Sequence, residues 1–471
     1  MVNTAVRDTF IVCRNSQGTE VRATPLRLTR FMAVFEVYNP YSILQLSEVL
    51  DEFKIIMNDR LVYTGRAVVS NLVNTGIVLV CEATLEDSWI DVDLFSPTAL
   101  GRHRLTEDFQ VFLKEWEKVH QVAPDFKVVV ADIQTLLMDL RRWLEQVELG
   151  IRSDPSMDRL KVERDVLEDL KAPILPTVTT LFRRFEEAAE SVPQEFQPVH
   201  RAYVKRQIHP LVLCSPFIYR TFQKPLGYAG DYEMVNMILR DPHEGSSLFA
   251  KILNLYILSQ APAEAHRNRV KYLLEKLRAE TLRASKPGSP ARIFNLGCGP
   301  AGEVQAFLIQ EDVCERAHLT LLDFNDETLA QTSRLLDDLK MRHRRATPIE
   351  LVKKSVNQVL KDGHKDPTGK GYDFIYCAGL FDYLSDRICR RLMDIFYSML
   401  APGGLLVATN VEASNPIRHL MEYVLEWHLV YRDPVQMATL APEAAPPGSC
   451  RVLPDTTGIN IFLEVRKPAD G

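Results

Sequence analysis

Three glycines in the stretch RIFNLGCGPAGEV, residues 292–304, mark the place where this sequence is best suited to hold a ligand. Gly297, Gly299 and Gly302 directly follow an apolar run, so we expect a strand that enters a turn and then a helix. Glycine allows backbone angles and close approaches that other residues do not. Asp323 ends the next apolar run, HLTLLDF, and a carboxylate at that point can accept both hydroxyl groups of a ribose. The spacing therefore predicts a binding site for a nucleoside-containing cofactor.

Both NAD and S-adenosylmethionine contain such a nucleoside, and two features favour the second. Glu303 follows the last glycine directly. A carboxylate there repels a pyrophosphate at the start of the helix, but it tolerates the cationic amino group of S-adenosylmethionine. Only about 170 residues follow the turn, which leaves little room for the separate catalytic domain of a dehydrogenase. A dehydrogenase is therefore the less favoured alternative.

Two further stretches carry polar side chains between apolar helices. KPLGYAGDYE, residues 224–233, contains Tyr228, Asp231 and Tyr232 among glycines, whose conformational freedom suits a functional loop. A purely structural alternative stands beside this interpretation: Asp231 is a helix N-cap and the tyrosines are packing residues. In NVEASNPIRHLMEYVLEWHLVYRD, residues 410–433, charged and aromatic residues alternate. Here the alternative is a solvated face of salt bridges at four-residue spacing.

The elements that must position these residues divide the chain into three parts. Residues 1–100 contain short runs rich in Val, Ile, Phe and Tyr with turn residues between them, which predicts a small antiparallel β-barrel. Residues 101–285 carry apolar residues at helical spacing, which predicts a helical region that acts as a lid. Residues 286–471 alternate strands and helices, which predicts a mostly parallel, Rossmann-like α/β sheet covered on both faces. Within this last part, we expect 436–454 to be a loop.

Composition argues against several classes of function. The 471-residue chain is 46% hydrophobic and 25% charged with a formal net charge of −6, so no bulk basic character favours nucleic acid. No apolar window is long enough for a membrane span, and the first ten residues do not resemble a signal peptide. The eight cysteines stand singly and the histidines show no metal-ligand spacing, so we expect no metal site. These features predict a cytoplasmic protein without nucleic-acid partners.

The C-terminal part resembles the class I S-adenosylmethionine-dependent methyltransferases. The resemblance covers roughly residues 290–471 and is carried, in order, by NLGCGPAGE, LLDFN, YDFIYCAGLFDYL, LAPGGLLVATN and INIFLEVRK. Such an ordered set is more specific than a lone glycine motif. It implies that S-adenosylmethionine is the cofactor. The cofactor-binding residues that it implies are Asn295, Gly297, Gly299, Gly302, Asp323, Phe324, Asn325, Ser355, Val356, Ala378, Gly379 and Leu380.

KPLGYAGDYE before the glycine turn and EWHLVYR after the fifth strand are similar to proteins related to the bacterial synthases of 3-hydroxy fatty acid methyl esters. This similarity implies O-methylation of a small-molecule or acyl carboxylate, with N-methylation of a small amine as an alternative. A carboxylate acceptor needs no general base at neutral pH, whereas an amine or an alcohol needs one. The expected catalytic residues are Tyr228, Asp231 and Glu426. The expected substrate-binding residues are Tyr232, Tyr383, Arg418, Trp427 and Tyr431.

The N-terminal part resembles PilZ domains, which bind cyclic di-GMP. Residues 71–76 follow the spacing of their D/N-x-S-x-x-G motif, with Val73 in place of the serine. PilZ domains also clamp phosphates with an RxxxR pair, but Arg22, Arg27 and Arg30 do not have this spacing. We therefore expect a degenerate PilZ-like barrel that does not bind the nucleotide and that provides a homodimer interface or a docking surface. The alternative is a PilZ-type regulatory or scaffold protein whose methyltransferase-like domain acts on a protein partner.

Overall fold

A computed structural model describes residues 9–29, 31–37, 44–57, 60–74, 78–86, 109–110, 113, 122–153, 158–362 and 371–469. The chain forms two compact units. The first comprises Met1–Ala229, Pro242–Ile257 and Pro416–His428, and the second comprises Gly230–Asp241, Leu258–Asn415 and Leu429–Gly471. Each unit therefore contains a short segment whose neighbours in the sequence belong to the other unit.

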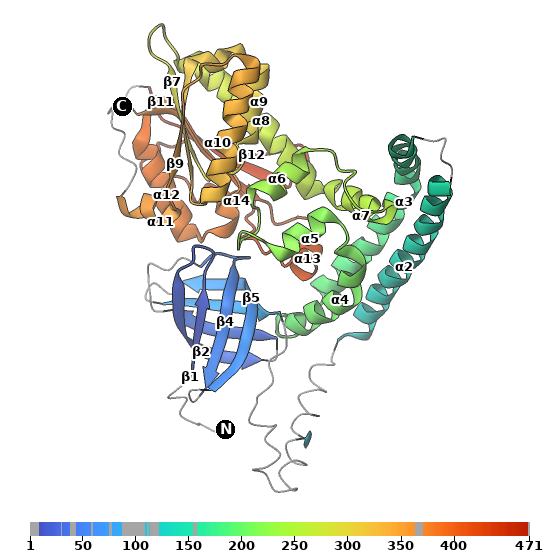
Figure 1. The fold of residues 1–471 in the computed structure, drawn as a ribbon. Helices are drawn as coiled ribbons and strands as arrows, with labels where there is room; N and C mark the ends of the chain where they lie inside the picture. Colours follow the sequence, from blue (N-terminus) through green and yellow to red (C-terminus); the bar gives the residue numbers. More distant parts are fainter. Residues whose placement is uncertain are drawn as a thin grey trace. The chain divides into compact units, whose positions relative to one another are not determined.

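Six antiparallel strands in the first unit close into a β-barrel in the order β1-β2-β3-β6-β5-β4 (Figure 1). The barrel closes because β1 pairs with both β2 and β4, as when Ile11 lies opposite Ala23 and Ile55. Phe35 and Phe53 are fully buried in its interior. The predicted antiparallel barrel is confirmed. Its strands are β1 (Thr9–Arg14), β2 (Glu20–Thr29), β3 (Met32–Val37), β4 (Val49–Met57), β5 (Arg60–Asn74) and β6 (Leu79–Leu85).

The residues of the PilZ comparison lie on two strands of this barrel. Val73 belongs to β5, and its side chain is exposed. Arg22 and Arg27 belong to β2. Arg30 and Gly76 lie outside the described residues. The assignment of the barrel as a PilZ-like domain therefore stays a prediction.

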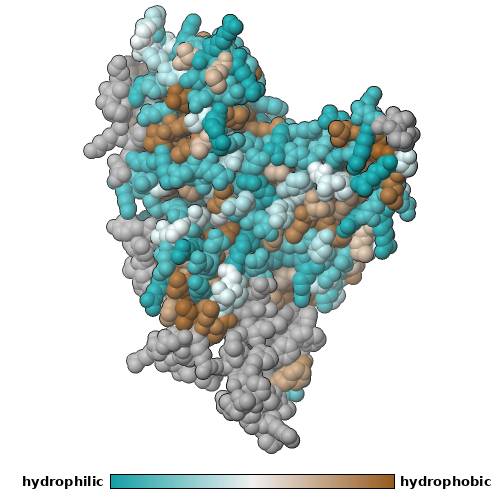
Figure 2. All heavy atoms as spheres, in the orientation of Figure 1, coloured by the Kyte–Doolittle hydropathy of each residue, from teal (hydrophilic) through white to brown (hydrophobic). Residues whose placement is uncertain are grey.

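Beyond the barrel, the described residues of the first unit are mainly helical. Phe126 on α2 and Phe185 on α3 pack with ring centroids 5.6 Å apart, and Tyr423 packs against Phe185 at 5.9 Å, so the segment Pro416–His428 is part of this hydrophobic core. Figure 2 shows a mainly hydrophilic surface with scattered hydrophobic side chains, and Trp143 on α2 is among the exposed hydrophobic residues. The helices are α2 (Pro124–Ser153), α3 (Arg159–Glu190), η2 (Gln194–Phe196), α4 (Gln197–Val212), α5 (Pro216–Gln223), α7 (Leu248–Leu258) and α13 (Arg418–Tyr423).

The second unit is built around a seven-stranded sheet in the order β12-β13-β11-β10-β7-β8-β9. The strands from β11 to β9 are parallel, and β13 and β12 join the β11 edge in antiparallel pairing. The strand order reverses its direction between β7 and β10, which is where open α/β sheets bind ligands at their carboxyl edge. The strands are β7 (Ala291–Leu296), β8 (Ala317–Asp323), β9 (Ile349–Lys353), β10 (Tyr372–Cys377), β11 (Leu400–Val411), β12 (Cys450–Pro454) and β13 (Asn460–Arg466).

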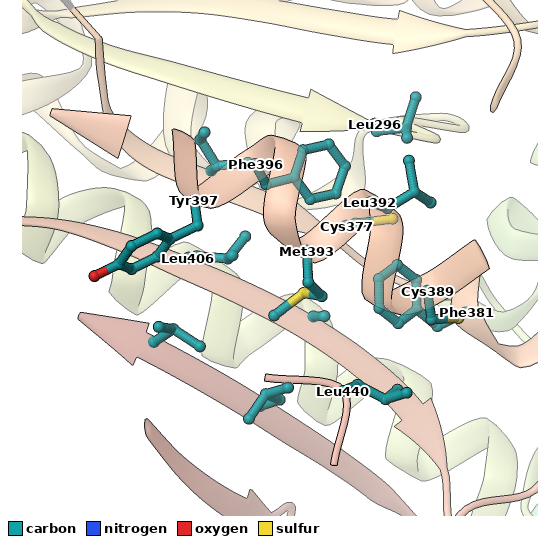
Figure 3. Close-up of a cluster of buried hydrophobic side chains, with 14 of the residues drawn as sticks. Leu296, Cys377, Phe381, Cys389, Leu392, Met393, Phe396, Tyr397, Leu406 and Leu440 are labelled. Carbon is teal, nitrogen blue, oxygen red and sulfur yellow. The ribbon is translucent and has the colours of Figure 1, made fainter. Parts of the chain in front are cut away.

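Helices cover both faces of this sheet, so the predicted Rossmann-like fold is confirmed. On one face, Leu392 and Phe396 of α12 pack in the same buried cluster as Leu406 of β11 (Figure 3). On the other face, Leu277 of α8 and Phe307 of α9 pack against the sheet. The helices of this unit are α6 (Tyr232–Leu239), α8 (Ala261–Ala284), α9 (Gly302–Gln310), η3 (Asp312–Arg316), α10 (Asp326–His343), α11 (Val356–Asp362), η4 (Phe381–Tyr383), α12 (Asp386–Met399) and α14 (Pro434–Ala438).

The prediction of a loop at 436–454 is wrong in part. The end of α14 and the whole of β12 lie within it. β12 pairs with β13 at the edge of the sheet, for example Arg451 with Glu464. An edge strand of five residues that ends in Pro454 carries little periodic pattern, and proline is tolerated there because an edge leaves its nitrogen without a partner strand.

Candidate active site

The glycine turn links the end of β7 to the start of α9. Gly297 and Gly299 have φ angles of 75° and 50°, in the left-handed region that favours glycine. The N–H groups of Gly297 and Cys298 both donate to Leu322 O, at 2.8 and 2.9 Å. Ala301, directly before α9, also has a positive φ of 52°. The turn is therefore held in one conformation against the end of β8.

Asp323, the last residue of β8, also binds the turn. Its Oδ2 accepts the N–H of Gly299 at 3.0 Å, and its Oδ1 accepts the N–H of Asn325 at 3.1 Å. The residue is only 7% exposed, and this burial raises the pKa of the carboxyl group. An ionised carboxylate has about four lone-pair sites, so Asp323 retains capacity to accept hydrogen bonds from a ligand. Asn325 caps α10, because its Oδ1 accepts the N–H of Thr328 at 2.9 Å.

Asn295, Glu303 and Tyr376 form a buried polar group at the ends of β7 and β10. Tyr376 Oη donates to Glu303 Oε1 at 2.7 Å, and burial raises the pKa of Glu303. Asn295 Oδ1 is buried and has no hydrogen-bond partner among the residues that the structure describes. A buried acceptor without a donor costs free energy, so its presence indicates a ligand that donates at this point. A cationic amino group fits both this oxygen and the adjacent carboxylate.

Arg269 on α8 is a candidate site residue that the sequence patterns do not predict. A β-carbon at Gly379 would lie 3.0 Å from Arg269 Nη1, so the guanidinium group packs directly against the backbone that follows β10. Its Nη2 donates to Nδ1 of His266 at 2.7 Å. Burial lowers the pKa of Arg269, and the nearby carboxylates of Asp382 and Glu303 oppose this effect. No local sequence pattern distinguishes this arginine from others on the helix, so only the fold reveals it.

The remaining predicted cofactor residues follow β9 and β10. The Ser355 N–H donates to Gln358 Oε1 at 2.7 Å, and the buried Val356 begins α11. Leu380 packs against the turn, because its Cδ2 lies 3.6 Å from the β-carbon position of Gly297. The carboxyl ends of four adjacent strands thus carry Asn295, Gly297, Gly299, Gly302, Asp323, Phe324, Asn325, Ser355, Val356, Ala378, Gly379 and Leu380. Their role in cofactor binding stays a prediction.

The predicted acceptor-site residues divide between the two units. The second unit contains Asp231, Tyr232, Tyr383 and Tyr431, and the first contains Tyr228, Arg418, Glu426 and Trp427. Asp231 is buried and caps α6, since its Oδ1 accepts the N–H of Met234 at 2.8 Å; this is the contact that the structural alternative describes. Tyr383 lies beside Gly230, where a β-carbon would be 2.8 Å from the tyrosine Oη. Asn415 Nδ2 donates to the Tyr431 hydroxyl at 3.4 Å.

Glu426 is held in a buried ion cluster of the first unit. Its Oε1 accepts from Lys205 Nζ at 2.5 Å, and Arg66 Nη1 lies 3.8 Å from its Oε2. Burial opposes ionisation, but Lys205, Lys224 and Arg66 lower the pKa of Glu426 to about 2. A group that stays ionised to such a low pH is poorly matched to proton abstraction near pH 7. These contacts therefore fit a structural ion pair better than a general base.

Arg418 and Trp427 also have partners within the first unit. Arg418 Nε donates to Glu422 Oε1 at 2.9 Å, and Glu422 Oε2 lies 3.6 Å from Arg201 Nη2. This is the salt-bridged arrangement that four-residue spacing on a helix favours. The Trp427 N–H donates to Met421 O at 2.9 Å, which fixes the backbone after α13.

Two further site types find no support in the described part of the chain. Among those residues, no group of three or more histidines, cysteines or acidic residues is arranged to hold a metal ion. None of the helices in the described ranges combines the length and the apolar character needed to cross a membrane. All eight cysteines are free thiols.

Residues 266–440 match a family model described as a methyltransferase domain. The matched segment begins on α8 and ends after α14, so it includes the glycine turn, Asp323 and Arg269. A comparison with curated protein sequences gives no match.

Several solved structures are similar to this chain. A possible exported protein from Bordetella parapertussis is 17% identical, with 64% of this chain and 97% of that chain covered and a TM-score of 0.43. The N-methyltransferase NodS from Bradyrhizobium japonicum WM9, in complex with S-adenosyl-L-homocysteine, is 17% identical, with coverages of 53% and 99% and a TM-score of 0.31. Magnesium protoporphyrin IX methyltransferase (ChlM) from Synechocystis PCC 6803, with bound S-adenosylhomocysteine, is 10% identical, with coverages of 53% and 98% and a TM-score of 0.35. These TM-scores are low, so the solved structures carry no argument. The methyltransferase domain is identified from the family model and from the strand order of the sheet.

Proposed function

Because residues 266–440 form a class I methyltransferase domain, we propose that this S-adenosylmethionine-dependent enzyme methylates a carboxylate of a small-molecule or acyl acceptor. The observation that carries the cofactor site is the buried Asn295 Oδ1, for which the described part of the chain offers no hydrogen-bond partner and which lies close to the turn that Asp323 binds. A ligand with both an ammonium group and ribose hydroxyls satisfies these groups together.

Each part of the cofactor has a complementary group in this proposal. Asp323 accepts hydrogen bonds from the ribose hydroxyls, and Asn295 and Glu303 accept from the methionine ammonium group. Arg269 binds the methionine carboxylate, because a guanidinium group matches a carboxylate with paired, charge-assisted hydrogen bonds. Gly297 has no side chain, so its backbone can approach the methionine part closely.

The proposed chemistry requires alignment more than proton transfer. S-adenosylmethionine supplies a methyl carbon that is already electrophilic, so the protein aligns a nucleophile behind it and excludes water. A carboxylate is ionised at neutral pH, so no base has to remove a proton from it. The contacts of the two predicted bases agree with this, because Asp231 caps a helix and Glu426 is paired with Lys205. An amine acceptor requires a base and is therefore less favoured.

The acyl nature of the acceptor rests on the similarity of KPLGYAGDYE and EWHLVYR to relatives of the fatty acid methyl ester synthases. Tyr232, Tyr383 and Tyr431 are the predicted substrate-binding residues that lie in the same unit as the proposed cofactor site. The division into a PilZ-like barrel at 1–100, a helical lid at 101–285 and a methyltransferase domain at 286–471 remains part of this proposal. So does a homodimer formed through the barrel.

The test incubates the full-length protein with a cell extract and methyl-labelled S-adenosylmethionine, and follows the label by mass spectrometry. We expect the label in a methyl ester, which mild base hydrolyses to labelled methanol. Heat-denatured protein is the control. Label that survives the base in an N-methylated amine would contradict the proposed acceptor class, and no protein-dependent label in any product would contradict the activity.

A further inference from the structure

Helix α6 contacts the cofactor site at both of its ends. At its start, the Tyr383 hydroxyl lies 2.8 Å from the β-carbon position of Gly230, so the helix begins beside the loop that follows β10. At its end, Leu239 Cδ1 lies 2.9 Å from the β-carbon position of Gly302, the first residue of α9. The segment that contains the helix therefore reaches from η4, which follows β10, to the start of α9.

A hydrogen bond fastens the same helix to a third loop of the site. Tyr232 Oη donates to Glu327 Oε1 at 3.0 Å. Glu327 lies in the first turn of α10, two residues after Asn325, whose N–H binds Asp323. The bond thus holds the start of α6 beside the place where the adenosine end of the cofactor is expected. A bond between a hydroxyl group and a carboxylate is charge-assisted and stronger than a neutral one.

The helix lies in a short segment of the second unit. It lies in the segment Gly230–Asp241, whose neighbours in the sequence on both sides belong to the first unit. Gly230 has a φ angle of 77°, a conformation that favours glycine at the entry to the segment. Arg267 Nε on α8 donates to Ile238 O at 3.0 Å near the other end. This hydrogen bond links the end of α6 to α8.

We propose that residues 230–239 belong to the cofactor site, and that Tyr232 and Glu327 are positioning residues that hold α6 over bound cofactor. This inference rests on the S-adenosylmethionine site proposed above. Tyr232 is predicted from the sequence to bind the acceptor. In this inference its role is instead to retain the cofactor. Because the Tyr232–Glu327 bond holds α6 against the start of α10, it slows the release of S-adenosylhomocysteine.

The test measures the dissociation rate of S-adenosylhomocysteine from immobilised full-length protein by surface plasmon resonance. Tyr232→Phe removes only the hydroxyl group, and Glu327→Gln removes the charge while keeping the shape. We expect each change to raise the dissociation rate about threefold to tenfold. The dissociation rate of the double variant should be only slightly higher than that of the faster single variant, because both changes remove the same hydrogen bond. Tyr219→Phe, at an exposed tyrosine on α5, is the matched control and should keep the wild-type rate.

The outcomes separate this inference from the proposed function. Wild-type dissociation rates in both single variants, with normal binding by the unchanged protein, would overturn the role of Tyr232 and Glu327 alone. An unchanged protein that does not bind S-adenosylhomocysteine at all would overturn both proposals. Glu327→Asp provides a rescue, because it keeps a carboxylate acceptor and should retain part of the slow release. Thermal unfolding of each variant shows whether a faster rate reflects a lost fold, and in that case the inference fails for that residue.

Discussion

Asp323 Oδ2 and the backbone N–H of Gly299 lie 3.0 Å apart, and this hydrogen bond joins the end of β8 to the turn that follows β7. The turn is held from a second side, because Thr332 Oγ1 on α10 donates to Gly299 O at 2.8 Å. The carboxylate predicted to bind ribose therefore also holds the turn that is predicted to bind the rest of the cofactor. A substitution at this position acts on the ligand and on the shape of its site together.

Asp323→Asn should weaken the binding of S-adenosylhomocysteine at least about tenfold, because it removes a charge-assisted contact to the ribose. The change should also lower the thermal unfolding temperature, because the amide has one acceptor oxygen and cannot accept both the Gly299 and the Asn325 N–H. Isothermal titration calorimetry and thermal unfolding measure the two effects. If the variant binds S-adenosylhomocysteine as tightly as the unchanged protein does, Asp323 does not contact the ribose.

Arg269→Ala should weaken the binding of S-adenosylhomocysteine about tenfold or more, since a charged hydrogen bond to the methionine carboxylate is lost. Arg269→Lys should recover part of the affinity, because it keeps the charge but not the paired geometry. Methylthioadenosine is the matched ligand, because it has the nucleoside and no carboxylate. Its affinity should be the same in both variants and in the unchanged protein, and an equal loss for both ligands would disprove the proposed contact.

Glu426→Gln should destabilise the first unit by about 3–5 kcal/mol at pH 7, because buried cations lose their partner. The native carboxyl has a pKa of about 2, against 4.5 for the ordinary group. Its ionisation therefore stabilises the folded state fully above the unfolded pKa, and this contribution is lost as the pH falls toward 2. Urea unfolding of both proteins at pH 7 and at successively lower pH values measures the difference. The difference in unfolding free energy between the two proteins should become smaller as the pH falls. A difference that does not depend on pH would contradict the ion cluster.

The full-length protein should not bind cyclic di-GMP. Val73 is exposed on β5 and offers no hydroxyl group, and Arg22 and Arg27 on β2 lack the RxxxR spacing. Isothermal titration calorimetry with the dinucleotide should give no binding heat. Saturable binding at micromolar concentrations would instead favour the regulatory alternative, in which the barrel senses a nucleotide.

Much of the sheet and its glycine turn could be predicted because their patterns are local. The run HLTLLDF predicts a strand, and β8 covers Ala317–Asp323. YDFIYC corresponds directly to β10. A strand buried on both faces needs a continuous apolar run, and a turn with positive φ angles favours glycine, so each feature is visible in a few consecutive residues. The sequence does not predict β12, because an edge strand needs neither a continuous apolar run nor a glycine turn.

The sequence by itself determined the class of fold, the turn at 297–302 and the carboxylate at Asp323, since each depends on the types and spacing of neighbouring residues. Only the tertiary structure decided that Arg269 packs against Gly379 and that Leu239 of α6 packs against Gly302. It also decided that Glu426 is paired with Lys205, 221 positions away in the chain. Such contacts are fixed by burial and by charge pairing between distant elements, and helical spacing alone does not say which partner a buried face will meet.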